Sequence, residues 1–169
     1  MPRLGFGAFL APHHPVGENP MLQFRRDLDL VERLDTLGYD EFWCGEHHSS
    51  GWEMIGSPEM FLAAAGERSK RIKLATGVVS LPYHHPFNVA QRMVQLDHMT
   101  GGRAIFGSGP GALASDAHTL AIDPMTQRDR QDEAIGVIRR LFNGERVTAK
   151  SDWFVMNDAK LQIRPLQED

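Results

Sequence analysis

The chain has 169 residues, of which 41% are hydrophobic and 24% are charged. Eighteen Lys and Arg residues stand against 22 Asp and Glu residues, so the formal net charge is −4. This slightly acidic balance, without a basic cluster, argues against nucleic acid or an anionic membrane as the main partner. The single cysteine, Cys44, excludes a disulfide framework and a four-cysteine zinc site. We expect no signal peptide, no membrane span and a cytoplasmic location.

The pattern of apolar and polar residues predicts strands that alternate with helices. An apolar run at residues 4–10 predicts a strand that is buried on both faces. Asn19 and Pro20 supply an N-cap and a first-turn proline for a helix that ends at Gly38. The alternation continues with strands expected at 39–45, 72–81 and 103–107, and helices expected at 57–68, 87–99 and 127–142.

Four strands and their helices predict an α/β fold, either a doubly wound sheet or half of a (β/α)₈ barrel. Near the C-terminus, β-prone runs at 153–155 and 161–163 predict an antiparallel hairpin or a short β excursion. Both architectures place their chemistry at the C-terminal ends of the strands. Six of the eight histidines lie in three loops at those ends, at 13–14, 47–48 and 84–85.

The three His-His pairs first suggest a metal site, with Glu46 and Asp116 as candidate carboxylate ligands. Adjacent residues of an extended chain point to opposite sides, so each pair offers one ligand at most. The HxH and HExxH spacings, which place two imidazoles on one ion, are absent. Histidines that cap helices or contact a ligand are the alternatives. We therefore predict no metal site, although a metal-dependent hydrolase stays open as a function.

The glycine-rich loop at 106–111 is compatible with a phosphate cradle or with a plain tight turn, because Pro110 breaks the GxGxxG spacing. A Rossmann domain is disfavoured, because no glycine fingerprint follows the first predicted strand. Cys44 lies in an apolar strand, which indicates a core residue rather than a nucleophile. Trp52 lies in the loop that follows Glu46, where it either lines an apolar pocket or packs at the rim.

Several motifs occur together in the order typical of one known family. They lie at residues 5–10, 37–40, 43–48, 74–79, 85–86, 96–103 and 106–109. With them the chain resembles the bacterial luciferase-like flavin-dependent monooxygenases, and most of all the subgroup labelled limonene monooxygenase. These enzymes are (β/α)₈ barrels. Because such a barrel needs about 250 residues, the resemblance implies that residues 1–169 form a single domain equivalent to its N-terminal half.

The resemblance also implies roles for individual residues. His47 matches the family's catalytic histidine, which suits proton transfer near neutral pH. The positions that contact the flavin match Gly77, Val78, Ser108 and Gly109, and the first two stand where members often hold a non-prolyl cis peptide bond. The substrate is expected against Phe9, Trp52 and His85. Pro110 stands where luciferase itself binds the flavin phosphate with an arginine, so that contact is expected elsewhere.

The implied reaction uses reduced FMN and O₂, which form a C4a-hydroperoxide that oxygenates a small, apolar organic substrate. A separate flavin reductase is the expected partner, and we expect this half alone to be inactive. An F420-dependent dehydrogenase of the same fold is the first alternative. A non-enzymatic half-barrel that forms a homodimer through its open sheet edges is another.

Overall fold

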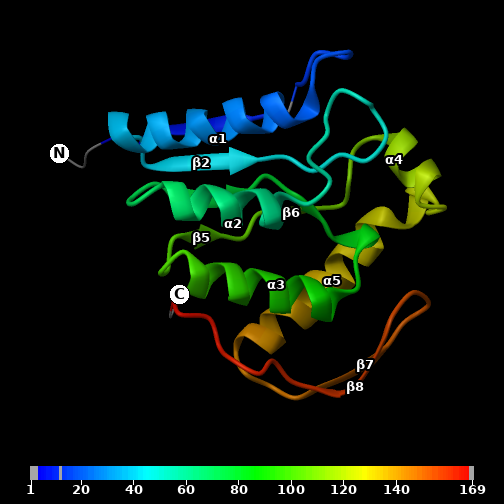
Figure 1. Cartoon of the computed structure of the whole chain (residues 1–169). Coiled ribbons are helices and arrows are strands. Elements are labelled where there is room, and N and C mark those ends of the chain that lie inside the picture. Colours follow the sequence, from blue (N-terminus) through cyan, green and yellow to red (C-terminus); the bar gives the residue numbers. More distant parts are fainter. Residues whose placement is uncertain (1–3, 12, 168–169) are drawn as a thin grey trace.

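The computed structural model describes residues 4–11 and 13–167 (Figure 1). Its main sheet has four parallel strands in the order β1-β2-β3-β5, which are β1 (Gly7–Leu10), β2 (Glu41–Cys44), β3 (Lys73–Thr76) and β5 (Ala104–Ile105). Phe9 pairs with Trp43, and Trp43 pairs with Ala75, so these three residues lie side by side across the sheet. The predicted α/β class and parallel sheet are confirmed. The first strand was predicted wrongly as buried on both faces, because it covers only Gly7–Leu10 at the edge of the sheet and Phe9 is 63% exposed.

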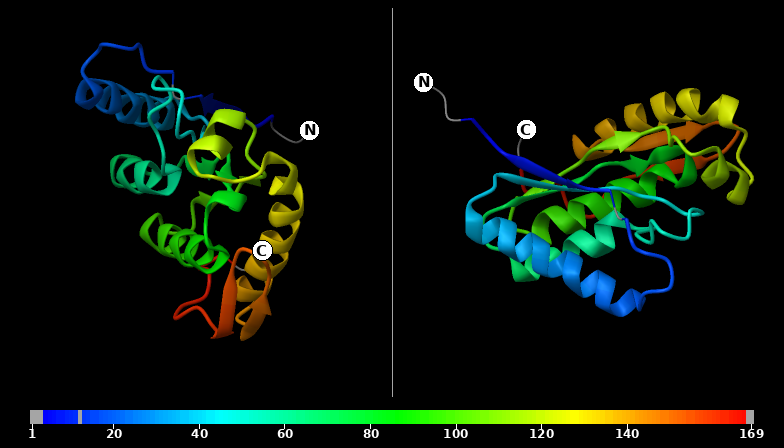
Figure 2. Two further views of the ribbon diagram at one scale, coloured as in Figure 1. Left: turned by 90° about the vertical axis from the view of Figure 1, so that its right-hand side faces the viewer. Right: turned by 90° about the horizontal axis from the view of Figure 1, so that it is seen from above.

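Long helices alternate with the strands along the chain. They are α1 (Pro20–Leu37), α2 (Pro58–Arg68), α3 (Pro86–Met99) and α5 (Gln127–Phe142). The predicted caps of α1 are confirmed, because the Asn19 side chain accepts the Met21 N–H and Gly38 has a φ of 83°. Figure 2 shows α1, α2 and α3 on one side of the strands, with α5 beside α3. The helices therefore cover one face of the sheet, and the core lies between that face and the helices.

The third predicted strand is broken by residues 77–78, and the fourth is shorter than predicted, with a further short strand in the predicted glycine-rich loop. β3 stops at Thr76, and β4 (Val79–Ser80) leaves the main sheet to pair with β6 (Ser108–Gly109). At the break, the Thr76 hydroxyl donates to the carbonyl of Gly107 and accepts the Gly107 N–H, in place of regular ladder bonds. The continuous strands predicted at 72–81 and 103–107 were therefore too long. The peptide bond between Gly77 and Val78 is cis, as the resemblance implied.

The C-terminal hairpin exists, but its strands differ from those predicted. β7 (Val147–Lys150) pairs antiparallel with β8 (Val155–Ala159), so the runs at 153–155 and 161–163 were wrong as the two strands. Trp153 lies in the connecting turn, where its ring packs under Arg130 and its Nε1 donates to Glu133, both on α5. The described residues also form three short helices, η1 (Leu81–Tyr83), α4 (Ala114–Thr119) and η2 (Pro124–Thr126).

The core lies between the sheet and the helices, and its fully buried large side chains include Val31, Phe42, Leu62, Leu74, Val89 and Ile138. Cys44 is fully buried there, as predicted, and burial raises the pKa of its thiol, which disfavours the reactive thiolate. Across residues 4–11 and 13–167, no helix combines the length and apolar character needed to span a bilayer.

Two glycines allow a test of how tightly the broken strands pack. A Cβ on Gly107 would lie 2.1 Å from the Thr76 carbonyl oxygen, whereas one on Gly136 in α5 would meet nothing within 4 Å. We expect Gly107→Ala to lower the free energy of unfolding by about 1–3 kcal/mol, since backbone must move. Gly136→Ala is expected to raise it by about 0.5–1 kcal/mol. Urea unfolding followed by circular dichroism measures both, and effects of equal sign would contradict the packing described.

Candidate active site

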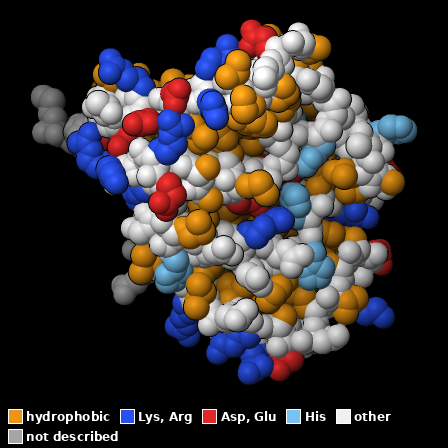
Figure 3. All heavy atoms as spheres, in the orientation of Figure 1, with side chains coloured by type: hydrophobic (Ala, Val, Ile, Leu, Met, Phe, Trp, Pro, Cys, Tyr) orange, Lys and Arg blue, Asp and Glu red, His pale blue; other side chains and the backbone are white. Residues whose placement is uncertain are grey.

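The candidate active site lies where the parallel strands end. In Figure 1 the arrow of β2 points to the right, and Figure 3 shows several histidine side chains toward that side of the same face. The loops that follow β1 and β2 meet there, because His13 forms a β-bridge with Glu53 and His14 donates its backbone N–H to the carbonyl of Trp52. Strand pairing thus gathers side chains that are distant in the sequence.

The four residues predicted to contact the cofactor lie next to one another. Pairing of β4 with β6 places Val79 beside Ser108 and Ser80 beside Gly109. A Cβ on Gly109 would lie 2.8 Å from Cγ2 of Val78, so this glycine leaves room for the valine. The Ser108 hydroxyl accepts a hydrogen bond from the Gln131 side chain of α5. The structure therefore brings Gly77, Val78, Ser108 and Gly109 together.

Two aromatic rings flank the cis peptide bond. A Cβ on Gly77 would lie 3.3 Å from ring carbons of both Phe9 and Trp43. Phe9 is 63% exposed, and Trp43 is half-buried with its Nε1 donating to Glu41. Because Gly77 carries no side chain, a flat molecule can approach both the apolar rings and the peptide backbone between them.

His47 lies between two buried carboxylates. Its Nδ1 is 3.2 Å from Oδ2 of Asp116, and its Nε2 is 3.6 Å from Oε1 of Glu53. Its side chain is 24% exposed, so solvent or a ligand reaches the ring. A carboxylate therefore lies near each ring nitrogen of His47, with the shorter distance at Nδ1. The contact with Asp116 orients the imidazole and turns Nε2 toward Glu53.

Asp116 is held by the same loop that carries His47. Its Oδ1 accepts the backbone N–H of His48 and the hydroxyl of Ser49. Burial by itself would raise the pKa of Asp116, but the hydrogen bonds from Ser49, His48 and His47 outweigh it and lower the pKa. Asp116 therefore stays ionised near neutral pH and maintains its contact with the imidazole.

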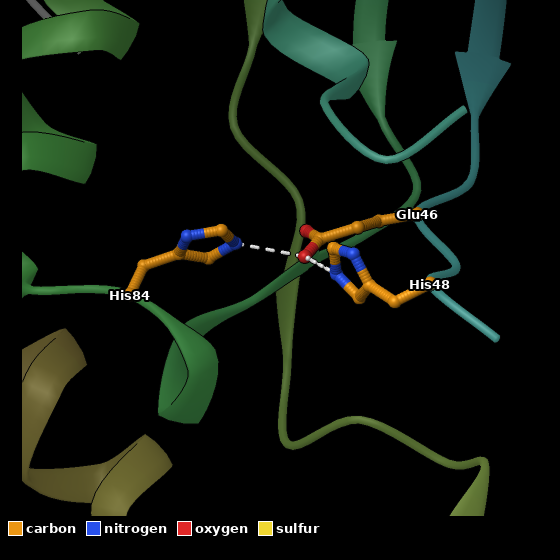
Figure 4. Close-up of side chains that lie close together, drawn as sticks. All are labelled: Glu46, His48 and His84. Atoms are coloured by element: carbon orange, nitrogen blue, oxygen red, sulfur yellow. Dashed lines mark hydrogen bonds and ion pairs between the residues drawn. The ribbon is translucent and has the colours of Figure 1, made fainter. Parts of the chain in front are cut away.

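Glu46 joins two histidines from different loops (Figure 4). Its Oε1 accepts hydrogen bonds of 2.7 Å from Nε2 of His48 and from Nε2 of His84, and its Oε2 accepts the Ser80 N–H. Burial would raise the pKa of Glu46, but these donors lower it, and the Glu46 carboxylate in turn raises the pKa of His48. The loop after β2 is thus tied at this carboxylate to Ser80 in β4 and to His84 after η1.

The two remaining predicted site residues, Trp52 and His85, lie in different surroundings. Trp52 is 41% exposed and its ring lies 4.5 Å from that of His13, at the rim of the same end. His85 caps α3, since its Nδ1 accepts the Phe87 N–H and its Nε2 is 3.3 Å from the Val155 carbonyl. A substrate contact of His85 stays a prediction, as does that of Trp52.

Sequence reasoning missed three contacts of this site. Of the pair His84 and His85, sequence reasoning proposed His85 as a site residue. The structure instead shows a hydrogen bond from Nε2 of His84 to Glu46. Sequence reasoning named Asp116 only as a possible metal ligand, not as the partner of His47, and it gave no role to Glu53. The Glu-His-His motif was the available signal for Glu46, but no local pattern points to Asp116.

Comparison with known proteins identifies the family of the chain. A family model described as "Luciferase-like monooxygenase" matches residues 4–169. The chain belongs to the luciferase-like monooxygenase family. It is 59% identical over 166 residues to 4-hydroxyprotoasukamycin monooxygenase of Streptomyces nodosus subsp. asukaensis, covering 98% of this chain and 45% of that protein. It is 58% identical over 163 residues to limonene 1,2-monooxygenase of Rhodococcus erythropolis, covering 96% of this chain and 42% of that protein.

Solved structures show the same fold for this member of the luciferase-like family. The crystal structure of monooxygenase RslO1 from Streptomyces bottropensis superposes with a TM-score of 0.91 at 29% identity, covering 98% of this chain and 51% of that one. The oxygenating constituent of 3,6-diketocamphane monooxygenase from Pseudomonas putida, in complex with FMN, gives a TM-score of 0.85 at 24% identity, covering 90% and 43%. The chain therefore has the fold of about half of a luciferase-like barrel.

Relatives of lower identity carry other names. A relative from Intrasporangium calvum, 33% identical over 152 residues covering 85% of this chain and 46% of that protein, is an F420-dependent glucose-6-phosphate dehydrogenase. Another from Acinetobacter baylyi, 27% identical over 120 residues covering 70% and 33%, is the oxygenase component of a flavin-dependent trigonelline monooxygenase. The chain spans less than half the length of these curated relatives.

Proposed function

We propose that this chain is the N-terminal half of an FMN-dependent monooxygenase that oxygenates a small, apolar organic molecule. The observation that carries the proposal is the placement of His47, oriented by ionised Asp116, at the strand ends that also hold the cis Gly77–Val78 bond and its aromatic neighbours. The two relatives that are almost 60% identical are both named monooxygenases. Because the chain covers under half of each, the activity is proposed for the whole protein.

The residues present fit a flavin. The apolar surface of Phe9, Trp43 and Gly77 suits a flat ring system, and the neighbouring Ser108 hydroxyl and Gly109 backbone supply polar contacts. We assign the cofactor to Gly77, Val78, Ser108 and Gly109, in line with the FMN held by the 3,6-diketocamphane relative. Reduced flavin, when bound, supplies the electrons that activate O₂.

The side chains of this half have separable tasks in the proposed reaction. His47 accepts or returns a proton at Nε2, while Asp116 holds the proton at Nδ1. Phe9 and Trp52, both more than 40% exposed at the strand ends, contact an apolar substrate and keep water from the reacting atoms. A separate flavin reductase supplies the reduced flavin, as the name "oxygenase component" of the trigonelline relative supports. We assign the protein to the cytoplasm.

Cofactor titration tests the proposal. A form that spans the full length of the relatives is mixed anaerobically with reduced FMN or with reduced F420, and binding is followed by the change in cofactor absorbance. We expect saturable binding of reduced FMN and, on admission of O₂, an oxygenated product from limonene or another small terpene. Saturable binding of F420 alone would replace the monooxygenase by an F420-dependent dehydrogenase. A stable full-length form that binds neither cofactor would overturn the proposed function. The non-enzymatic half-barrel that forms a homodimer is tested separately, by light scattering on the 169-residue chain.

A further inference from the structure

The cluster of Glu46, His48 and His84 has a donor set that the proposed oxygenation does not use. The three side chains converge from two loops, and one ligand atom from each lies within 4.8 Å of the other two (Figure 4). Within the described residues, no other group of three His, Cys, Asp or Glu side chains meets this spacing. His48 comes from the pair at 47–48 and His84 from the pair at 84–85. Each pair therefore supplies one ligand, as expected for adjacent residues of an extended chain.

The carboxylate of this cluster is anchored in the way that a metal-binding carboxylate is. The Glu46 side chain is fully buried, and the Ser80 N–H holds its Oε2, which leaves Oε1 facing the two imidazoles. Hydrogen-bonded outer partners of this kind fix the orientation of ligating carboxylates in metal sites. A buried negative charge is costly unless it is paired or coordinates a metal ion, and the two imidazoles are compatible with both arrangements.

We propose that Glu46, His48 and His84 bind one divalent transition-metal ion of the zinc class, through Oε1 of the glutamate and Nε2 of each histidine. Two imidazoles and one carboxylate form a common zinc donor set that leaves a fourth position for water. Binding uses the lone pair of each Nε2, so the Nε2 proton moves to Nδ1 of the same ring or to solvent. The ion would clamp the loop after β2 to the loop after η1.

The cluster can open enough to admit the ion. Ligand atoms of a tetrahedral zinc site with bonds near 2.0–2.2 Å lie roughly 3.3 Å apart. The two Nε2 atoms are now 2.7 Å from Oε1, so each imidazole must retreat by roughly half an ångström. Both histidines lie outside helices and strands, with side chains 18% and 19% exposed, so both rings have space and solvent on one side.

Zinc titration of the 169-residue chain, purified with chelator and then freed of it, tests the proposal. Competition with a chromophoric zinc indicator at pH 7.5 should show one Zn²⁺ per chain. We expect His48→Ala and His84→Ala to weaken zinc binding at least about tenfold. His85→Ala is the control, because the His85 ring contacts the Phe87 N–H and the Val155 carbonyl instead of Glu46. This variant should bind zinc as tightly as the wild type.

The outcomes separate a metal site from a hydrogen-bonded cluster. No saturable zinc binding by the wild-type chain, or equal binding by the wild type and His84→Ala, would overturn the proposal. If the alanine variants lose their circular dichroism signal, cobalt titration of the wild type decides. The intense visible absorption of tetrahedral Co²⁺ at one equivalent supports the site, and its absence refutes it. None of these readouts depends on flavin binding or oxygenation. Failure of the metal-site proposal is therefore distinguishable from failure of the proposed function.

Discussion

Replacement of His47 by alanine is expected to lower the rate of substrate oxygenation by about 100- to 10,000-fold, the usual contribution of a positioned acid or base. The reason is the loss of the imidazole that Asp116 orients through Nδ1, at the strand ends that also hold the proposed flavin surface. The rate is measured with reduced FMN and O₂ on a form that spans the relatives' full length. Binding of reduced FMN is measured in parallel, and we expect it to change much less than turnover.

His118→Ala is the matched control, because His118 is an exposed histidine of α4 in the same short helix as Asp116. We expect this variant to oxygenate the substrate at the wild-type rate. Both variants are checked by circular dichroism, since His47 is partly exposed and its removal should leave the fold intact. Near-normal turnover by His47→Ala would remove His47 from the proposed reaction.

Asp35→Ala is expected to lower the free energy of unfolding by about 3 kcal/mol, because three backbone donors lose their acceptor. The Asp35 carboxylate, in the last turn of α1, accepts the N–H groups of Lys70, Arg71 and Ile72 at 2.7–2.9 Å. It is 8% exposed and joins the end of α1 to the segment that enters β3. Urea unfolding of the chain measures the change.

The pH dependence of unfolding gives a second measurement on the same residue. Burial alone would raise the pKa of Asp35, but the backbone donors and the Arg71 guanidinium lower it below its ordinary value of 3.8. Because the folded pKa is the lower one, the contribution is complete above the unfolded value and disappears as pH falls through the folded value. The difference in stability between wild type and Asp35→Ala should therefore shrink as the pH is lowered below about 4.

Asp29→Ala is the control for Asp35, since both aspartates lie in α1. The Asp29 side chain is 64% exposed and pairs with Arg68 at the surface, where ion pairs contribute about 0–1 kcal/mol. We expect this variant to unfold within about 1 kcal/mol of the wild type. An equal decrease in the free energy of unfolding for the two variants would contradict the prediction. It would show that the three backbone hydrogen bonds of Asp35 contribute no more stability than a surface ion pair does.

Sequence patterns alone determined the features that depend on neighbouring residues. The start of α1 at Asn19 and Pro20 and its end at Gly38 follow from local backbone preferences, so they were predicted correctly. The alternation of strands and helices gave the fold class, and the ordered motifs gave the family, which the match over residues 4–169 confirms. The burial of Cys44 followed from its place in an apolar strand.

Tertiary structure alone decided which side chains meet. Asp116 reaches His47 across 69 residues of sequence, and His84 reaches Glu46 across 38, so no periodic pattern links either pair. Asp35 even places a negative charge at the C-terminal end of a helix, where the helix dipole disfavours it, and only the donors from residues 70–72 explain it. Strand pairing and loop geometry fix these contacts, because they set which loops adjoin at the ends of the sheet.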